Sequence, residues 1–122
     1  MKIGFIGVGK LGKDAAEVMH EAGHDVLGYD TRMDVDCSFN MTWRLEDVCK
    51  HGEIIFIAVP TPHAEGYDGS VPSSHMEPRD FGHDAVIDAI NNVNRYATTS
   101  KKVVLISTVL PGTTRKHFIT LL

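Results

Sequence analysis

The chain has 122 residues, which is enough for one domain and too few for two domains of ordinary size. Hydrophobic residues make up 43% of the sequence and charged residues 23%, a composition that supports a buried core and argues against global disorder. The formal charge of −4 argues against a nucleic-acid partner or a cationic membrane patch. No apolar run reaches the roughly 18–20 residues of a membrane span. Cys37 and Cys49 form no CxxC pattern, so we expect no disulfide framework and a reducing, cytoplasmic location.

Strand-like and helix-like segments alternate from the first residues onward. Between residues 10 and 22 the apolar side chains recur at three- and four-residue spacing, which predicts an amphipathic helix. Residues 53–59 and 102–107 are almost continuously apolar, as are strands that are covered on both faces of a parallel sheet. By these criteria the sequence predicts strands at 2–6, 25–30, 53–59 and 102–107, a loop at 31–42, and helices at 10–22, 43–50, 83–97 and 112–122.

This order of elements is typical of an α/β fold of the Rossmann type, a doubly wound parallel sheet. We expect a single domain over residues 1–122, with about four parallel strands in the order 3-2-1-4 and helices on both faces. The strand at 102–107 would then lie at an edge, where an apolar strand favours self-association. A homodimer through this edge or through the last helix follows as a prediction. Trp43 opens the helix at 43–50, where we expect it to anchor packing.

One connection is much longer than the others. Residues 60–82 join the third predicted strand to the next helix, where about two to six residues are usual. The segment is rich in glycine and proline and includes His63 and His75 among acidic residues. It is either a functional loop or an insertion. Because no pair of these side chains has a tight ligand spacing, we predict no metal site.

The segment GVGKLG directly follows the first predicted strand and opens the first predicted helix. In a G-x-G-x-x-G turn, the first glycine permits the tight turn, the second lets the backbone approach a pyrophosphate, and the third lets the helix pack closely on the strand. The free N–H groups and the positive dipole at the helix start favour binding of the phosphates. The motif therefore predicts a dinucleotide site at Gly7, Val8, Gly9, Lys10, Leu11 and Gly12.

Asp30 ends the second predicted strand, about 20 residues after the motif, where an acidic residue bonds the ribose hydroxyls of a bound dinucleotide. Its carboxylate would repel a 2′-phosphate, so the sequence favours NAD over NADP as the cofactor. Arg32 leaves a question open, because an arginine at this place can pair with that phosphate. The alternative is that the glycines only form a turn and that Asp30 is a solvated strand end.

Two further segments follow the third and fourth predicted strands at their carboxyl ends, where ligands bind in open α/β sheets. They are VPTP at residues 59–62 and STVLPGTT at residues 107–114. Both offer hydroxyl groups and turn-forming prolines in place of helix-forming residues. They are either ligand-binding turns or ordinary loops, in which Thr113 or Thr114 caps the last helix.

In this order, GVGKLG, a strand that ends in Asp30, AVPTP and STVLPGTT resemble the N-terminal NAD-binding domain of the UDP-glucose/GDP-mannose dehydrogenase family. The resemblance covers nearly the whole chain. It implies an NAD-dependent oxidoreductase that oxidises a nucleotide-sugar alcohol twice, to the carboxylate. For a full-length enzyme it implies a role in polysaccharide biosynthesis, in the supply of capsule or exopolysaccharide precursors.

The resemblance also implies roles for residues in the first half of the chain. The backbone of Lys10 and Leu11 would meet the pyrophosphate of NAD. Asp30 would bind the adenosine ribose, with Arg32 near it.

Farther along the chain, Pro60 and Thr61 would line the adenine-ribose side, and Val59 beside them would also bind the cofactor. Thr108 would lie near the nicotinamide and help to position the catalytic water. The chain departs from the family at Leu110, where proline is common, and in the longer stretch that follows PTP.

The catalytic cysteine of the family, its dimerisation region and its substrate domain lie downstream of the cofactor domain, and we expect them to be absent from these 122 residues. Neither Cys37 nor Cys49 follows a strand on the catalytic side, so we expect neither to be the nucleophile. The chain is therefore predicted to be a fragment that binds NAD weakly and meets a nucleotide sugar only within a full-length enzyme. Two alternatives stay open, a β-hydroxyacid-dehydrogenase-type N-terminal domain and a stand-alone NAD-binding or interaction module without catalysis.

Overall fold

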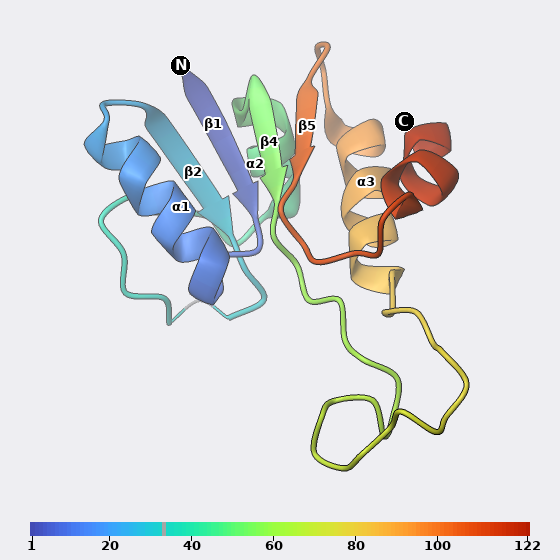
Figure 1. Cartoon of the computed structure of the whole chain (residues 1–122). Coiled ribbons are helices and arrows are strands. Elements are labelled where there is room, and N and C mark those ends of the chain that lie inside the picture. The colour runs from blue at the N-terminus through green and yellow to red at the C-terminus, as the bar shows by residue number, and fades with distance from the viewer. Residues whose placement is uncertain (33) are drawn as a thin grey trace.

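The computed structural model of the chain describes residues 1–32 and 34–122, so one position of the predicted loop 31–42 lies outside the described residues. The described residues form one five-stranded sheet in the order β3-β2-β1-β4-β5 (Figure 1). The strands are β1 (Lys2–Ile6), β2 (Asp25–Tyr29), β3 (Asn40–Met41), β4 (Ile54–Ile57) and β5 (Lys102–Leu105). Every pairing is parallel, which confirms the predicted Rossmann-type fold.

The sheet differs from the predicted one in the short strand β3, which lies within the predicted loop 31–42. It pairs with β2, with Leu27 opposite Asn40, and so takes the third place in the sheet. The predicted neighbours of the strand at 53–59 were therefore wrong, because β4 pairs with β1 and not with β2. A two-residue strand has no period that a sequence pattern could reveal. As predicted, β5 lies at an edge of the described sheet.

Helices cover both faces of this sheet. In Figure 1, α1 (Lys10–Glu21) lies in front of β1 and β2, whereas α2 (Leu45–His51) and α3 (Asp84–Tyr96) lie behind the sheet. The predicted last helix is a π-helical turn, η1 (Thr114–Phe118), followed by a 3-10 turn, η2 (Ile119–Leu121). Within the described part of the chain, no helix has the length and apolar character needed to cross a membrane.

The start of α2 corrects the expectation for Trp43. The helix begins at Leu45, so Trp43 precedes its first turn, and its side chain is 77% exposed. Packing on the core comes instead from Val48 and Cys49, which are buried on the inner face of α2. Trp43 is therefore a surface residue and does not anchor the helix.

Two hydrophobic cores lie on opposite faces of the sheet. The core under α1 consists of Ile3, Phe5, Val8, Ala16, Val26 and Phe39. The core under α2, α3 and η1 consists of Ile6, Val48, Cys49, Ile55, Ile57, Val86, Ala89, Ile90, Val93 and Phe118. On the α1 side, Phe56 of β4 packs against the first core, but its neighbour Val104 on β5 is 40% exposed. On this face, the side chains of the sheet are therefore less buried toward β5 than at its centre.

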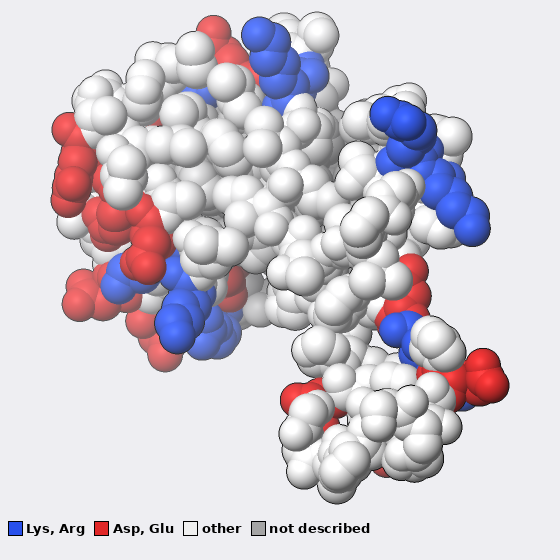
Figure 2. All heavy atoms as spheres, in the orientation of Figure 1, with Lys and Arg blue, Asp and Glu red and all other residues white. Residues whose placement is uncertain are grey.

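The long connection at residues 60–82 is held together by its own contacts. The Gly82 N–H donates a hydrogen bond to the Pro62 carbonyl at 2.9 Å, and the rings of His63 and Phe81 lie 4.9 Å apart. Farther out, the Tyr67 hydroxyl donates to a backbone carbonyl across the loop. The segment projects from the body of the molecule (Figure 2), and the acidic and basic side chains in view lie on this segment and around the margin of the face, with an uncharged area between them. These contacts join the two ends of the loop and cross its middle.

Candidate cofactor site

The turn after β1 depends on Gly7. Its φ is +93°, a conformation that is strained for residues with a side chain. A Cβ atom at Gly7 would lie 2.3 Å from the Ala58 carbonyl oxygen, and the Gly7 N–H donates to the Tyr29 carbonyl at 2.9 Å. The first glycine of the motif therefore makes the tight turn and holds it against the ends of β2 and β4.

The other two glycines of the motif have different surroundings. A Cβ atom at Gly12 would lie 2.4 Å from the Gly7 carbonyl oxygen, so this glycine lets α1 pack against the turn. At Gly9 the nearest atom to such a Cβ is Nη2 of Arg32, at 4.0 Å. Gly9 thus faces open space, into which a ligand can approach the backbone.

The first turn of α1 opens toward this space. The Lys13 N–H donates to the Gly9 carbonyl at 2.8 Å, so the N–H groups of residues 10–12 have no partner within the helix. No side chain caps this end, and the first turn contains no acidic residue. The positive end of the helix dipole is therefore uncompensated there, which favours an anionic group such as a pyrophosphate.

Asp30 ties the end of β2 to the glycine turn. Its Oδ2 accepts a hydrogen bond from the Val8 N–H at 2.8 Å, and its Oδ1 accepts one from the Arg32 N–H at 2.9 Å. The guanidinium Nε of Arg32 lies 3.7 Å from Oδ1, and the Asp30 side chain is 12% exposed. Each carboxylate oxygen has a second lone pair, so Asp30 can still accept a hydrogen bond from a ligand hydroxyl.

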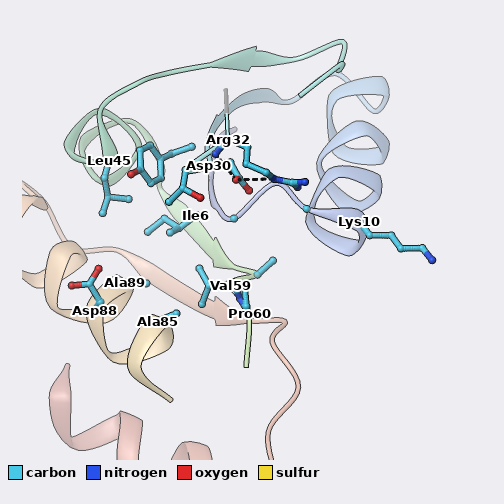
Figure 3. A pocket seen from close by; sticks show the side chains of 15 residues that line it. Ile6, Lys10, Asp30, Arg32, Leu45, Val59, Pro60, Ala85, Asp88 and Ala89 are labelled. Carbon is cyan, nitrogen blue, oxygen red and sulfur yellow. Dashed lines mark hydrogen bonds and ion pairs between the residues drawn. The ribbon is translucent and has the colours of Figure 1, made fainter. Parts of the chain in front are cut away.

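Two cavities lie on either side of the glycine turn. The larger of the two, here called the adenosine-side cavity, has a volume of about 480 Å³ (Figure 3). It is lined by Ile6, Gly7, Gly9, Lys10, Tyr29, Asp30, Thr31, Arg32, Leu45, Ala58, Val59, Pro60, Ala85, Asp88 and Ala89.

The second cavity, here called the nicotinamide-side cavity, has a volume of about 200 Å³. It is lined by Gly9, Lys10, Leu11, Gly12, Ala58, Val59, Pro60, Thr61, Ile106, Ser107 and Thr108. The Ser107 hydroxyl donates to the Val59 carbonyl at 2.7 Å, which joins the turns that follow β4 and β5. The exposed Thr108 lies at this second cavity.

The structure brings together all but one of the residues that the sequence predicts for the site. The exception is Val8, whose side chain is buried under α1 and whose N–H is donated to Asp30. Sequence reasoning missed the contributions of α2 and α3 to the adenosine-side cavity, which are Leu45, Ala85, Asp88 and Ala89. The spacing of Ala85, Asp88 and Ala89 places them on one face of a helix, but nothing in the sequence predicts that this face borders the cavity.

Neither cysteine lines either cavity. Burial raises the pKa of Cys49 to about 11, and burial together with the nearby Glu17 carboxylate raises the pKa of Cys37. Both are therefore protonated thiols at neutral pH, and a thiol is a poor nucleophile compared with a thiolate. Among the described residues, no group of three or more His, Cys, Asp or Glu side chains could hold a metal ion.

A parallel Rossmann-type sheet, a glycine turn at a free helix start and an acidic residue at the end of β2 define a dinucleotide-binding domain. Residues 31–122 match the model of the UDP-glucose/GDP-mannose dehydrogenase family, NAD binding domain. The chain belongs to this family, and NAD is the cofactor of the domain. The match begins after Asp30, so it excludes the glycine turn and includes VPTP and STVLPGTT.

Solved structures share the fold at low sequence identity. GDP-mannose dehydrogenase from Pseudomonas aeruginosa superposes with a TM-score of 0.78 at 20% identity, over 99% of this chain and 31% of that one. UDP-D-ManNAc dehydrogenase from Pyrococcus horikoshii gives 0.76 at 24% identity, over 99% and 32%. Pyrroline carboxylate reductase from Plasmodium falciparum, with NADP bound, gives 0.61 at 21% identity, over 88% and 33%. The chain thus spans about a third of the length of these proteins. A search of curated proteins finds no match to the sequence.

Proposed function

We propose that this chain is the cofactor domain of a nucleotide-sugar dehydrogenase of the UDP-glucose or GDP-mannose 6-dehydrogenase type, which converts an alcohol to a carboxylate in two steps. The observation that carries the proposal is the family match over residues 31–122, because it includes the turns after β4 and β5 that border the nicotinamide-side cavity. We further propose that residues 1–122 act as one cofactor domain in the cytoplasm, as two free thiols are consistent with a reducing compartment.

The residues of the site suit NAD at each part of the molecule. Asp30 has lone pairs for the ribose hydroxyls of adenosine, and the exposed guanidinium of Arg32 is next to it. The free N–H groups at Lys10 and Leu11 suit the pyrophosphate, and Gly9 leaves room for it. Bound NAD supplies the acceptor for a hydride. In this chain, Val59 and Pro60 border both cavities and would line the path between them, whereas Thr61 borders only the nicotinamide-side cavity.

Thr108 is our candidate for a residue near the nicotinamide. It is exposed at the nicotinamide-side cavity, and its hydroxyl can donate and accept hydrogen bonds. We propose that it helps to position the nicotinamide and the catalytic water in a complete enzyme. Ser107, which bonds to Val59, would hold the turn that presents Thr108.

We also propose that the 122-residue chain by itself oxidises no nucleotide sugar. Its two thiols have raised pKa values and lie outside both cavities, so neither suits covalent catalysis. The chain also spans about a third of the length of its solved relatives. A nucleotide sugar would therefore be a partner of the longer enzyme only.

Self-association is the remaining part of the proposal. Lys102 and Ile106 direct their N–H groups toward β4, so the backbone groups of Val103 and Leu105 point away from the described sheet, as alternate residues of a strand do. The exposed Val104 adds an apolar side chain beside this edge. Such an edge pairs readily with a second strand, which supports a homodimer through β5, or through the exposed side chains of the last helical turns.

Calorimetric titration with NAD and NADP tests the cofactor part. We expect NAD to bind more tightly than NADP, and Asp30→Ala to weaken NAD by about tenfold or more, the equivalent of one charge-assisted hydrogen bond. Asp36→Ala removes an exposed carboxylate that lines neither cavity and should change nothing. If NAD fails to bind the wild type, or binds Asp30→Ala equally well, the proposed site is wrong.

Two measurements test the proposed inactivity toward nucleotide sugars and the proposed self-association. NADH absorbance with UDP-glucose or GDP-mannose should stay flat, and steady NADH formation would overturn the proposal of inactivity. Light scattering over a concentration series should show a species larger than the monomer, and Val104→Lys should shift it toward the monomer. A monomer at every concentration would contradict association through this edge.

A further inference from the structure

We propose that Asp88 recognises the base of the bound dinucleotide by accepting a hydrogen bond from the exocyclic amino group of adenine. The proposal deepens the function proposed above and rests on the adenosine half of NAD lying in the adenosine-side cavity. It makes Asp88 a residue that determines which base the cofactor carries.

The adenosine-side cavity has charged groups on two sides. Figure 3 shows Asp30 and Arg32 on one side, and Asp88 on α3 on the other. Apolar side chains line the space between them, namely Ile6, Leu45, Val59, Ala85 and Ala89. A flat ring system that is joined at one end to a sugar with hydroxyl groups and carries a polar group at the other end matches this arrangement, and adenosine has that form.

The α3 side of the cavity has room for a ring. Ala85, Asp88 and Ala89 share one face of the helix because they are three and four residues apart, and all three line the cavity. The two alanines flank Asp88 with the smallest side chains that a helix tolerates well. A base that lies against this face therefore meets no bulky side chain before it reaches the carboxylate.

The carboxylate of Asp88 has no other partner among the described residues. Among these residues, no side-chain hydrogen bond or ion pair involves the Asp88 carboxylate. Only the backbone carbonyl of Asp88 accepts a side-chain bond, from Asn92 Nδ2 at 2.8 Å. Asp30 differs, because both of its carboxylate oxygens already accept bonds from backbone N–H groups. Asp88 thus presents its full acceptor capacity to whatever enters the cavity.

Helix electrostatics do not account for an acidic residue at this position. Acidic side chains stabilise the first turn of a helix, and Asp84 occupies that turn of α3. Asp88 follows one turn later, where the dipole effect has faded and the like charge at Asp84 is mildly unfavourable. Asp88 is exposed and lines the cavity, so its carboxylate is free to meet a ligand there.

The chemistry of a carboxylate selects among bases. An ionised carboxylate only accepts hydrogen bonds, so it favours the amino group at position 6 of adenine. Hypoxanthine carries an oxygen at that position, and two acceptors that face one another repel. A hydrogen bond to a charged group is stronger than one between neutral groups, and because Asp88 is exposed to water we expect a preference of only about tenfold.

Calorimetric titrations with NAD and with nicotinamide hypoxanthine dinucleotide test this inference. We expect the wild type to prefer NAD by about tenfold. Asp88→Ala should weaken NAD by about the same factor with little change for the hypoxanthine analogue, so that the preference disappears. Asp88→Asn keeps the shape and adds a donor, so it should bind the analogue at least as well as NAD. Asp84→Ala, which removes the neighbouring carboxylate outside both cavities, is the matched control and should keep the preference.

Several results would overturn the proposal. Equal binding of the two dinucleotides by the wild type would do so, as would an unchanged preference in Asp88→Ala and Asp88→Asn. Failure of this inference differs from failure of the proposed function, because NAD would still bind and would still depend on Asp30. Circular dichroism of each variant would show whether it retains the fold.

Discussion

The two cavities beside the glycine turn differ in how completely the chain encloses them. The adenosine-side cavity, at about 480 Å³, is bordered by the ends of three strands and by α2 and α3. The nicotinamide-side cavity, at about 200 Å³, is bordered by the start of α1 and by the turns after β4 and β5. The first lies over the interior of the sheet, and the second lies toward the edge strand.

With NAD bound as proposed, this difference predicts that the chain makes most of its contacts with the adenosine half of the cofactor. Asp30, Arg32 and Asp88 border only the adenosine-side cavity, and Thr61, Ser107 and Thr108 border only the other one, whereas Lys10 borders both. Recognition of the cofactor and most of its binding affinity would therefore come from the adenosine half, and hydride transfer would occur at the nicotinamide half. The glycine turn stands between them and is common to both.

The largest effect is expected from Gly7→Ala, which would disrupt the turn that separates the two cavities. The new Cβ would lie 2.3 Å from the Ala58 carbonyl oxygen, so backbone atoms must shift in addition to the strain of a positive φ. We expect a loss of at least about 3 kcal/mol in the free energy of unfolding, measured with urea, and loss of NAD binding.

Gly23→Ala is the matched control for that variant. Gly23 has nearly the same φ, +91°, but a Cβ there meets nothing within 4 Å. Conformational strain alone should cost about 1–2 kcal/mol. Equal destabilisation of the two variants would show that the close approach to Ala58 contributes nothing.

Gly9→Ala separates stability from binding in the same turn. The backbone of Gly9 has a negative φ of −78°, and a Cβ fits without a close contact, so the free energy of unfolding should change by less than about 1 kcal/mol. The methyl group would enter the space that both cavities share, and NAD affinity should fall by tenfold or more, about 1.4 kcal/mol. Unchanged affinity would contradict an approach of the pyrophosphate to Gly9.

Fragments of the cofactor compare the two cavities directly. ADP-ribose, which lacks the nicotinamide, should bind within about threefold of NAD, a difference of less than about 1 kcal/mol. Nicotinamide mononucleotide should show no measurable binding at the same concentrations. If removal of the nicotinamide lowers affinity by a hundredfold, the nicotinamide-side cavity contributes far more than its size suggests.

Substitution of the two cysteines is expected to have the smallest effect on the cofactor site. Because burial raises the pKa of Cys49 to about 11, Cys37→Ser, which leaves only Cys49, should resist Ellman's reagent at pH 8 until urea unfolds the chain. Cys49→Ala, which leaves the half-buried Cys37, should react slowly without urea. Neither variant should change NAD affinity, since both thiols lie outside the cavities. Rapid labelling of Cys49 in the folded protein would contradict its burial.

The raised pKa of Cys49 also has a consequence for stability. A thiol whose folded pKa lies above its ordinary value of 9.0 favours the folded state while it is protonated in both states. That contribution is complete below about pH 9 and is lost as the pH rises toward 11. Unfolding with urea at pH 8 and at pH 11 should show a larger loss in the wild type than in Cys49→Ala.

Much of the fold was accessible to sequence analysis because its signals are local. The apolar runs at 53–59 and 102–107 lie where β4 and β5 form, and the three- and four-residue spacing at 10–22 corresponds to α1. Two local expectations were wrong, for β3 and for Trp43. A two-residue strand has no period, and an aromatic side chain that precedes a helix can point to solvent.

By itself, the sequence determined the glycine turn and the acidic end of β2, because each depends on a few neighbouring residues with special geometry or charge. The tertiary structure decided which distant residues join them. Asp88 faces the same cavity as Asp30 only because β4 pairs with β1 and α3 packs behind the sheet. Strand order and helix packing arise from contacts between residues far apart in the chain, and the periodic pattern of apolar residues in a sequence does not predict which residues make those contacts.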